Sequence, residues 1–487
     1  MDPAGSGYIL LLGHGKFGQF GDEPLPSRLL DRRRSTPSDV QQLICGGWSS
    51  SYARTASGEV YSMRGAKFHS VAGSPAGIEA VAMGLAADSR LSLPSGEHCV
   101  GLAVGWQGIV AAVTDAGTLA SWQDGASGKP FATLTPTECA EAAAAPQRLT
   151  SVAVGAEGAV LAVSEEGGLW AWRNELLKAV PVQLPAQPSL RVRVVGVSCG
   201  RRHTALVDSN GNAYTYGWGL YGQLGHGDTH GDTSRAEPTP VLVDDGQQGL
   251  NGWPCTAVAC GGWHTAFLCN PRAAGRSRDA AAPPSSLGEH KRGSGAAAAA
   301  ADAAVHVAGG VRGNRLLTCG WNEGGQLGHG GSADGNGGDS GAHVFHGNAS
   351  VPTPMIVPGL EGVEMNGVAC GSRYTLACTE AGELWAFGWA VHGELKSATT
   401  GSMLLKPPAA QKRQKQEEEQ EECWHEPVRI RTEDWLNGSG ARAAAAADSG
   451  STESEELEGG NVAVALGATL SSGGWHASVV CDWENDT

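Results

Sequence analysis

The chain has 487 residues, 41% of them hydrophobic and 17% charged, and a formal net charge of -16 at pH 7. This length suits two or three ordinary domains or one large repeat assembly. A chain with this negative net charge repels DNA and phosphate groups, so we expect no direct nucleic-acid partner. Its 72 glycines favour many tight turns over long helices.

An apolar segment at residues 8–12 runs into the sequence GHGKFG at 13–18. This G-x-G-x-x-G spacing is typical of a dinucleotide-binding turn, which opens a helix. Two prolines that follow soon afterwards stop a helix in its first turns, and the same spacing returns at 214–228 and, more loosely, at 316–330. We therefore interpret the segment as one copy of an internal repeat and expect no cofactor.

Each repeat unit begins with an apolar strand that ends at a glycine. Seven such strands are present, and their glycines are Gly46, Gly105, Gly155, Gly200, Gly261, Gly371 and Gly473. Where nothing is inserted, successive glycines lie about 45 to 60 residues apart, which suits a four-stranded propeller blade. A cysteine precedes four of these glycines, namely Cys45, Cys199, Cys260 and Cys370. We predict buried thiols at these positions instead of disulfides or metal ligands, and no metal site.

The second half of each unit begins with a tight turn. In five units at least one of the two residues before the glycine of this turn is polar, and these glycines are Gly58, Gly117, Gly167, Gly211 and Gly382. The pattern predicts a hairpin with the glycine at positive φ, followed by a strand of alternating side chains. In the fifth unit an insert replaces the turn, and the strand resumes at Arg315.

The seventh unit has a first half at residues 470–480 but no second half after it. The N-terminal segment, residues 8–21, has the sequence of a second half. If its strands complete the last blade, the ring closes and no sheet edge is exposed. We therefore predict an all-β fold, a seven-bladed β-propeller whose ring is closed by N-terminal strands in the C-terminal blade.

We expect a single propeller domain over residues 1–487, interrupted by two long inserts. The insert at 270–314 is rich in Ala, Gly, Arg and Ser, and the insert at 397–460 contains the charged run QKRQKQEEEQEE. Few apolar residues anchor either insert, so both have the composition of disordered segments. Order is expected to return at 424–430, where WHEPVRI resembles the Pro-Val strand of other units.

No segment of the chain has the sequence of a membrane anchor or a leader. Apolar runs do not approach the ~20 residues of a spanning helix, and residues 9–12 are too short for the apolar part of a signal peptide. The scattered cysteines indicate a reducing compartment. We therefore expect a monomeric cytoplasmic or nuclear protein, or one found in both compartments, with no membrane partner.

The repeat resembles that of the regulator of chromosome condensation family. The shared residues are Cys-Gly-x-x-His-Thr, then Gly-Gln-Leu-Gly, then Pro-x-Pro-Val, and the match is best over residues 197–243. The family implies a seven-bladed propeller in which the recurring residues are structural. These are Gly46, Gly200, His203, Gly261, His264, Gly371, His476, Gly222, Gln223, Gly225, Gly325, Gln326 and Gly328. We predict that the recurring histidines form hydrogen bonds within their blades and bind no metal.

The family implies three classes of function: a protein-interaction scaffold, guanine-nucleotide exchange on a Ran-like small GTPase together with chromatin binding, and UV-B perception. No residue that we can name supports exchange. The resemblance implies that repeats of the family's UV-B receptor carry the motif Gly-Trp-Arg-His-Thr. In this chain Trp48, Trp263 and Trp475 lie one position later than the Trp of that motif, where the family has Arg. No Ser-His-Asp, Cys-His or paired-carboxylate pattern recurs, so we expect no enzyme. We favour a non-catalytic scaffold with a regulatory or chromatin-associated role, and keep exchange and UV-B perception as alternatives.

A propeller presents variable loops on two faces, which is the usual geometry of a protein-binding platform. We predict that the loops after the first strands bind the partner, because they carry residue types that are enriched in binding hot spots. These residues are Trp48, Arg201, Arg202, Trp263, Arg373, Tyr374 and Trp475. The resemblance implies a protein partner, with a small GTPase or a chromatin-modifying protein as candidates. The alternative binding site is the insert at 397–460, which would fold on its partner.

Overall fold

The structure, a computed structural model, consists mainly of β-strands. The structure describes residues 8–12, 28–32, 34–46, 50–71, 80–106, 108–123, 130, 132–134, 148–155, 159–172, 180–185, 192–228, 233–241, 250, 252–271, 313–330, 350–379, 383–389, 423–430, 464–472 and 477–484. These residues form 29 β-strands and one short 3-10 helix, η1 (Ala87–Ser89). The predicted all-β class is confirmed.

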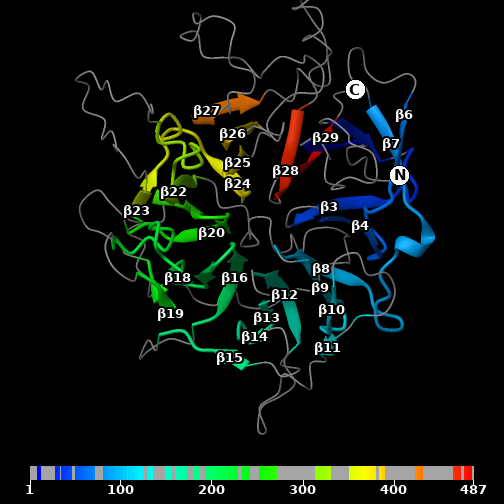
Figure 1. The fold of residues 1–487 in the computed structure, drawn as a ribbon, viewed down its shortest axis with the longest axis horizontal. Helices are drawn as coiled ribbons and strands as arrows, with labels where there is room; N and C mark the ends of the chain where they lie inside the picture. Colours follow the sequence, from blue (N-terminus) through cyan, green and yellow to red (C-terminus); the bar gives the residue numbers. More distant parts are fainter. Residues whose placement is uncertain are drawn as a thin grey trace, which may run out of the picture.

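The strands form seven sheets that surround a common centre, as the blades of a propeller (Figure 1). Five of the sheets have four antiparallel strands each, and the strands in a sheet are consecutive in the chain. The first two of these blades contain β8 (Cys99–Val104), β9 (Ile109–Thr114), β10 (Leu119–Gln123) and β11 (Ala132–Leu134), then β12 (Leu149–Val154), β13 (Val160–Ser164), β14 (Leu169–Trp172) and β15 (Val180–Val182). The prediction of seven blades is confirmed.

Three further four-stranded blades follow, and they include the best copies of the repeat. The first has β16 (Val194–Cys199), β17 (His203–Asp208), β18 (Ala213–Gly217) and β19 (Arg235–Pro240). The second has β20 (Cys255–Cys260), β21 (His264–Cys269), β22 (Arg315–Trp321) and β23 (Ser350–Ile356). The third has β24 (Met365–Cys370), β25 (Tyr374–Thr379), β26 (Leu384–Trp389) and β27 (Cys423–Ile430). We call them the β16, β20 and β24 blades.

The ring is closed by strands from both ends of the chain. The order in this sheet is β28 (Val464–Ser472), β29 (Ala477–Glu484), β1 (Tyr8–Leu12), β2 (Arg28–Asp31), β7 (Ala80–Gly84) and β6 (Lys67–Ser70). Leu10 in β1 pairs with Val479 in β29 on one side and with Leu29 in β2 on the other. The predicted closure by N-terminal strands is therefore confirmed, and Figure 1 shows the two ends on the same side of the ring.

One blade departs from the expected four strands. It contains only β3 (Val40–Gly46), β4 (Ser50–Thr55) and β5 (Val60–Ser62). The next strand, β6, instead pairs with β7, and β7 runs parallel to β2 in the closing sheet. The chain segment after β5 thus extends the blade that closes the ring.

The core lies between neighbouring blades. One buried cluster joins Ala205 and Val207 from β17 to Val258, Cys260 and Phe267 from the next blade. All four cysteines that precede a repeat glycine are buried free thiols, as predicted. Burial raises the pKa of the Cys370 thiol to about 12, so this group is an inert part of the core.

The hairpin glycines adopt the predicted positive φ. Gly58, Gly117, Gly167 and Gly211 have φ between 79° and 81°. At Gly211 a Cβ atom would also lie 2.6 Å from Cβ of Pro254, so both the backbone conformation and the packing require glycine. Gly382 lies outside the described residues.

Several sequence predictions concern residues that the structure does not describe. They include the GHGKFG segment and nearly all of the insert at 270–314. Strand β22 begins at Arg315, as expected. Within 397–460 only β27 is described, and it contains the predicted strand at 424–430. Among the described residues, no helix has the length and apolar character needed to cross a membrane.

Candidate functional site

The Gly-Gln-Leu-Gly loops join neighbouring blades. Gly222 and Gly225 have φ of 77° and 75°, and a Cβ atom on Gly222 would lie 2.6 Å from Cα of Pro352 in β23. Gly227 in the same loop donates a backbone hydrogen bond of 2.9 Å to the Pro352 carbonyl oxygen. Gly325 and Gly328 repeat the conformation one blade later, with φ of 77° and 70°. The glycines therefore allow each loop to lie against the neighbouring blade.

The glutamines of these loops hold the turns that precede them. The side-chain oxygen Oε1 of Gln223 accepts a hydrogen bond of 3.0 Å from the backbone N–H of Tyr221. In the next blade Oε1 of Gln326 accepts one of 2.9 Å from the N–H of Gly324. Both glutamines are fully buried. They therefore fix the turns on which Tyr221 and its neighbours are presented.

The histidines at the start of the second strands bond between blades. Nε2 of His203 lies 2.8 Å from Oγ1 of Thr265, which donates its own hydrogen to the Gln223 carbonyl oxygen at 2.7 Å. Nε2 of His264 lies 3.0 Å from Oγ1 of Thr375 in the following blade. The prediction of bonds within the blade is therefore wrong: the first residue of the second strand faces the neighbouring blade, where the Thr hydroxyl supplies its partner.

The ring of each of these residues lies against a repeat glycine. A Cβ atom on Gly200 would lie 2.5 Å from Cε1 of His203, and Gly261 has the same relation to His264. Gly371 has the same relation to Tyr374. Gly46, at the end of β3, packs against Val104 of the next blade. Close approach of a ring or a neighbouring strand thus explains why glycine recurs here.

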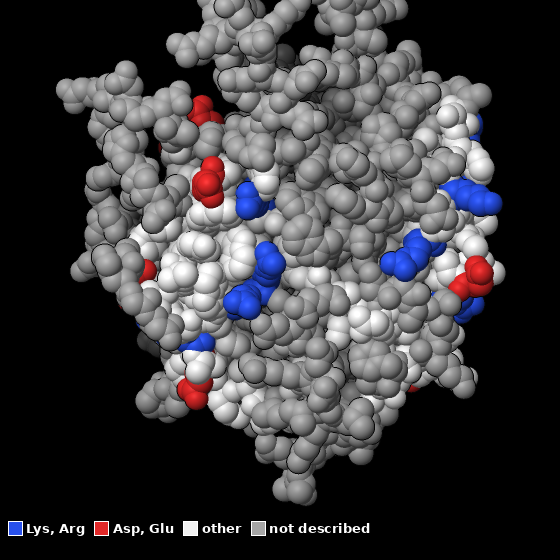
Figure 2. Space-filling view, viewed as in Figure 1, with Lys and Arg blue, Asp and Glu red and all other residues white. Residues whose placement is uncertain are grey.

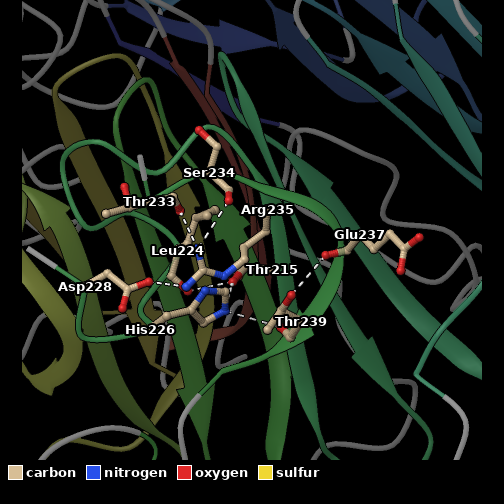
Figure 3. A network of polar contacts seen from close by, with 9 residues as sticks. All are labelled: Thr215, Leu224, His226, Asp228, Thr233, Ser234, Arg235, Glu237 and Thr239. Atoms are coloured by element: carbon tan, nitrogen blue, oxygen red, sulfur yellow. Dashed lines mark hydrogen bonds and ion pairs between the residues drawn. The ribbon is translucent and has the colours of Figure 1, made fainter. Parts of the chain in front are cut away.

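A second polar network holds the outer loop of the β16 blade (Figure 3). Thr215 donates to the Leu224 carbonyl oxygen at 2.6 Å and lies 3.0 Å from Nε2 of His226. Arg235 pairs with Asp228 and donates to two backbone carbonyl oxygens. The next blade repeats the first part with Thr318, Leu327 and His329. Because two blades share these contacts, we assign them a structural role.

Aromatic and arginine side chains from three consecutive blades form a continuous group. We call it the aromatic–arginine cluster, and its members are Arg201, Trp218, Tyr221, Trp263, Trp321, Arg373 and Trp389. Each member is partly exposed. Figure 2 shows basic side chains close to the centre of the face, over the inner parts of the β16 and β24 blades.

The rings of the cluster contact one another across the blades. The Trp263 and Trp218 rings form a T-shaped pair with centroids 5.1 Å apart. The Trp263 and Tyr221 rings form a second T-shaped pair with centroids 5.9 Å apart. Tyr221 stacks on Trp321 at 5.7 Å. These separations are those of favourable aromatic pairs. The β16 and β20 blades thus form one aromatic surface.

Arginines lie over the rings of this surface. The guanidinium carbon of Arg201 lies 4.9 Å from the centroid of Trp263. That of Arg373 lies 4.7 Å from the centroid of Trp321 and 4.1 Å from that of Trp389. Cation–π attraction holds such charged groups on a surface without removing them from water.

The predicted partner-binding residues are only partly brought together. Arg201, Trp263 and Arg373 belong to the cluster, and Arg202 is exposed beside it. Tyr374 is 1% exposed, so the expectation that it projects from the surface is wrong. It occupies the position that His has in the preceding blades, where the side chain points into the protein. Trp48, Trp475 and the repeat residues Gly473 and His476 lie outside the described residues.

Four members of the cluster were absent from the predicted set: Trp218, Tyr221, Trp321 and Trp389. Three of them share a sequence signal, because each follows a glycine of positive φ at the end of a third strand, at Gly217, Gly320 and Gly388. The backbone N–H of Trp321 donates to the Trp263 carbonyl oxygen at 3.0 Å, and that of Trp389 to the Arg373 carbonyl oxygen at 2.8 Å. The two loops of a blade are therefore tied side by side.

No metal centre accompanies the cluster in the part of the chain that the structure describes, where no three His, Cys, Asp or Glu side chains are placed to hold an ion. Burial lowers the pKa of His203 to about 4 and that of His264 to about 3. Both imidazoles are therefore neutral hydrogen-bond donors at pH 7. The chemistry that the cluster offers is that of a binding surface.

The family profile described as Regulator of chromosome condensation (RCC1) repeat matches residues 210–268 and 314–378, and a second profile of that description matches residues 194–223. The matches include six of the seven cluster residues. Residues 194–268 and 314–378 therefore carry RCC1 repeats. The predicted resemblance is thus confirmed, and the propeller supports a role in protein interaction or regulation.

Curated relatives of the chain include RCC1 domain-containing protein 1 from Homo sapiens, 28% identical over 228 residues, which are 46% of the chain and 51% of that protein. The segments GGWH, CGWNE and ACGSR predict this likeness, which is confirmed. The Ultraviolet-B receptor UVR8 from Arabidopsis thaliana is 30% identical over 226 residues, which are 44% of the chain and 45% of the receptor. The chain therefore spans about half the length of these relatives.

Solved structures support the propeller fold of the chain independently. The crystal structure of Prp20p from Saccharomyces cerevisiae superposes with a TM-score of 0.55 at 14% identity. The match covers 99% of this chain and 92% of Prp20p. At this identity the likeness establishes the propeller architecture and no more.

Proposed function

We propose that this protein is a non-catalytic scaffold that binds a protein partner through the aromatic–arginine cluster. The observation that carries the proposal is the continuous chain of contacts from Arg201 through Trp263, Tyr221 and Trp321 to Arg373. Trp, Tyr and Arg are enriched among the few residues that dominate the binding energy of protein interfaces.

The scaffold holds this surface in one arrangement. Tyr221 is fixed by the buried Gln223, and both Trp321 and Trp389 are tied by backbone hydrogen bonds to the neighbouring loop. Such a preorganised surface loses little conformational freedom on binding. Leu220, which directly precedes Tyr221, is 55% exposed and adds an apolar side chain at the margin of the cluster.

Affinity capture from cell extract tests the proposal. The wild-type chain is compared with a Trp263→Ala, Arg373→Ala variant and with a matched control, Tyr61→Ala, Arg90→Ala. Tyr61 and Arg90 suit the control because they form a β-bridge with each other outside the three blades of the cluster. Arg90 also forms an ion pair with Glu59 at 2.9 Å. Loss of one captured protein with the first variant and its retention with the control support the scaffold. Equal capture by both variants contradicts it.

The same capture experiment distinguishes exchange from scaffolding. The crystal structure of Prp20p was determined together with the binding properties of Prp20p to Gsp1p and histones. A small GTPase or a chromatin-modifying protein is therefore the first class of partner to test. Recovery of a GTPase that binds best in its nucleotide-free form would replace the scaffold proposal by nucleotide exchange.

One observation favours a second candidate, a response to UV-B light. The relative named Ultraviolet-B receptor UVR8 matches 44% of the chain, and the indoles of Trp218 and Trp263 contact each other at 5.1 Å. A UV-B sensor of this kind would change its assembly under light. Light scattering before and after UV-B irradiation tests it: an unchanged mass supports the scaffold, and a change in mass that Trp263→Phe abolishes supports light sensing.

A further inference from the structure

Arg373 combines a fixed position with unused hydrogen-bond donors. Its guanidinium carbon lies over Trp321 at 4.7 Å and over Trp389 at 4.1 Å. The side chain donates no hydrogen bond to any residue that the structure describes, and it forms no ion pair there. An arginine has five N–H donors, and ring contacts leave these donors free to bind an acceptor.

No described carboxylate neutralises this charge. Glu323, which is exposed on the turn after Trp321, forms no ion pair with Arg373. Arg201, whose guanidinium carbon lies 4.9 Å from the centroid of Trp263, belongs to the same cluster. In a chain with a net charge of -16, the positive charge of Arg373 attracts acidic ligands that the rest of the surface repels.

The fork of a guanidinium matches the geometry of a carboxylate, which it binds through two parallel N–H···O bonds. The rings that hold Arg373 limit its rotation, so less side-chain entropy is lost when such a pair forms. Tyr221 stacks on the Trp321 ring that Arg373 covers, and Leu220, which precedes Tyr221 in the chain, is exposed. Both offer apolar contact to a neighbouring side chain of the same ligand. The surface is therefore suited to a peptide in which acidic and apolar residues lie close together.

We infer that Arg373 binds a Glu or Asp carboxylate of the partner, and that the partner presents an acidic linear segment to the aromatic–arginine cluster. This inference rests on the proposed scaffold function and adds the chemistry of its partner.

Fluorescence anisotropy with labelled peptides tests the inference on the full chain. The first probe is a peptide in which glutamates flank a leucine, the second has Gln at each Glu position, and the third has phosphoserine there. We expect the Glu peptide to bind about tenfold or more tightly than the Gln peptide. Arg373→Gln should weaken the Glu peptide about tenfold, and Arg373→Lys should weaken it less.

The control variant is Arg90→Gln, which removes an exposed arginine from another blade and should leave binding unchanged. Equal binding of the Glu and Gln peptides, with loss in Trp321→Ala, would overturn the acidic-segment inference and leave the scaffold proposal intact. Binding of the Glu peptide that Arg373→Gln does not weaken would also overturn it. Binding of the phosphoserine peptide alone would identify phosphate as the ligand and overturn the carboxylate assignment. Absence of binding by all three would overturn it as well, while the capture experiment decides on the scaffold separately.

Discussion

The imidazole of His203 and the hydroxyl of Thr265 lie 2.8 Å apart and belong to different blades. The Thr265 hydroxyl has one hydrogen, which it donates to the Gln223 carbonyl oxygen at 2.7 Å. It must therefore accept the hydrogen of His203 Nε2–H. The β16 blade contributes both the His and the Gln, and the β20 blade contributes the Thr. This bond pair therefore stabilises the contact between blades.

Removal of the Thr265 hydroxyl should weaken this contact. In Thr265→Val the His203 N–H and the Gln223 carbonyl lose their partner in a buried site, which costs about 1–3 kcal/mol. Thr265→Ser keeps the hydroxyl and should cost much less. Urea unfolding of the three proteins measures the difference, and equal stability of the Val and Ser variants would contradict the role of the bond.

Stability should fall as the pH is lowered from about 6.5 towards 4. Burial lowers the pKa of His203 to about 4 and of His264 to about 3, from 6.5 in the unfolded chain. Between these values the unfolded state binds more protons, so stability is fully present above pH 6.5 and decreases as the pH falls. Each histidine contributes a slope of about 1.4 kcal/mol per pH unit within this window.

The His203→Gln, His264→Gln variant isolates this contribution from that of the carboxylates. Its stability should depend less steeply on pH than that of the wild type, even though it is lower at pH 7. Denaturant unfolding at a series of pH values gives both slopes. Parallel slopes for the two proteins would show that these histidines do not titrate on unfolding.

Gly222 should tolerate alanine worse than Gly359, although their backbones are alike. The φ values are 77° and 80°, so each substitution carries the same backbone penalty of about 1–2 kcal/mol. A Cβ atom on Gly222 would meet Pro352 at 2.6 Å, whereas nothing lies within 4 Å of one on Gly359. Thermal unfolding of Gly222→Ala and Gly359→Ala therefore measures the packing of the loop against β23. A larger loss for Gly359→Ala would contradict this packing.

The pair of Arg373 and Trp389 should contribute little to the stability of the fold. A partly exposed cation–π contact is worth about 0.5–1 kcal/mol. A double-mutant cycle with Arg373→Met and Trp389→Leu should give a coupling energy of this size from urea unfolding. All three variants should remain folded, so their binding defects can be attributed to the surface. A coupling of several kcal/mol would instead assign the pair to the structural core.

Most of the fold could be predicted because its determinants recur locally. Apolar strands that end at glycine recur in every unit, and turn glycines such as Gly117 and Gly211 recur in five units. Both depend on residues that are close in the chain. Counting the halves of the units also predicted that β1 joins β29. The pairing of β6 with β7 was not predicted, because it follows no repeat pattern.

The candidate site was only partly predictable. Sequence analysis selected Arg201, Trp263 and Arg373 by residue type and position, but it also selected Tyr374, whose ring is buried against Gly371. It assigned the bond of His203 to its own blade, because nothing in a single unit indicates which side chains face across a blade boundary.

The repeat, the number of blades and the closure of the ring could all be predicted from the amino-acid sequence. The contacts of Arg373 with Trp321 of the β20 blade and with Trp389 of its own blade, and the contact between Trp218 and Trp263, appear only in the folded protein. Hairpins and turns are formed by residues close in the chain, whereas contacts between blades depend on the distance and angle at which complete sheets pack around the ring.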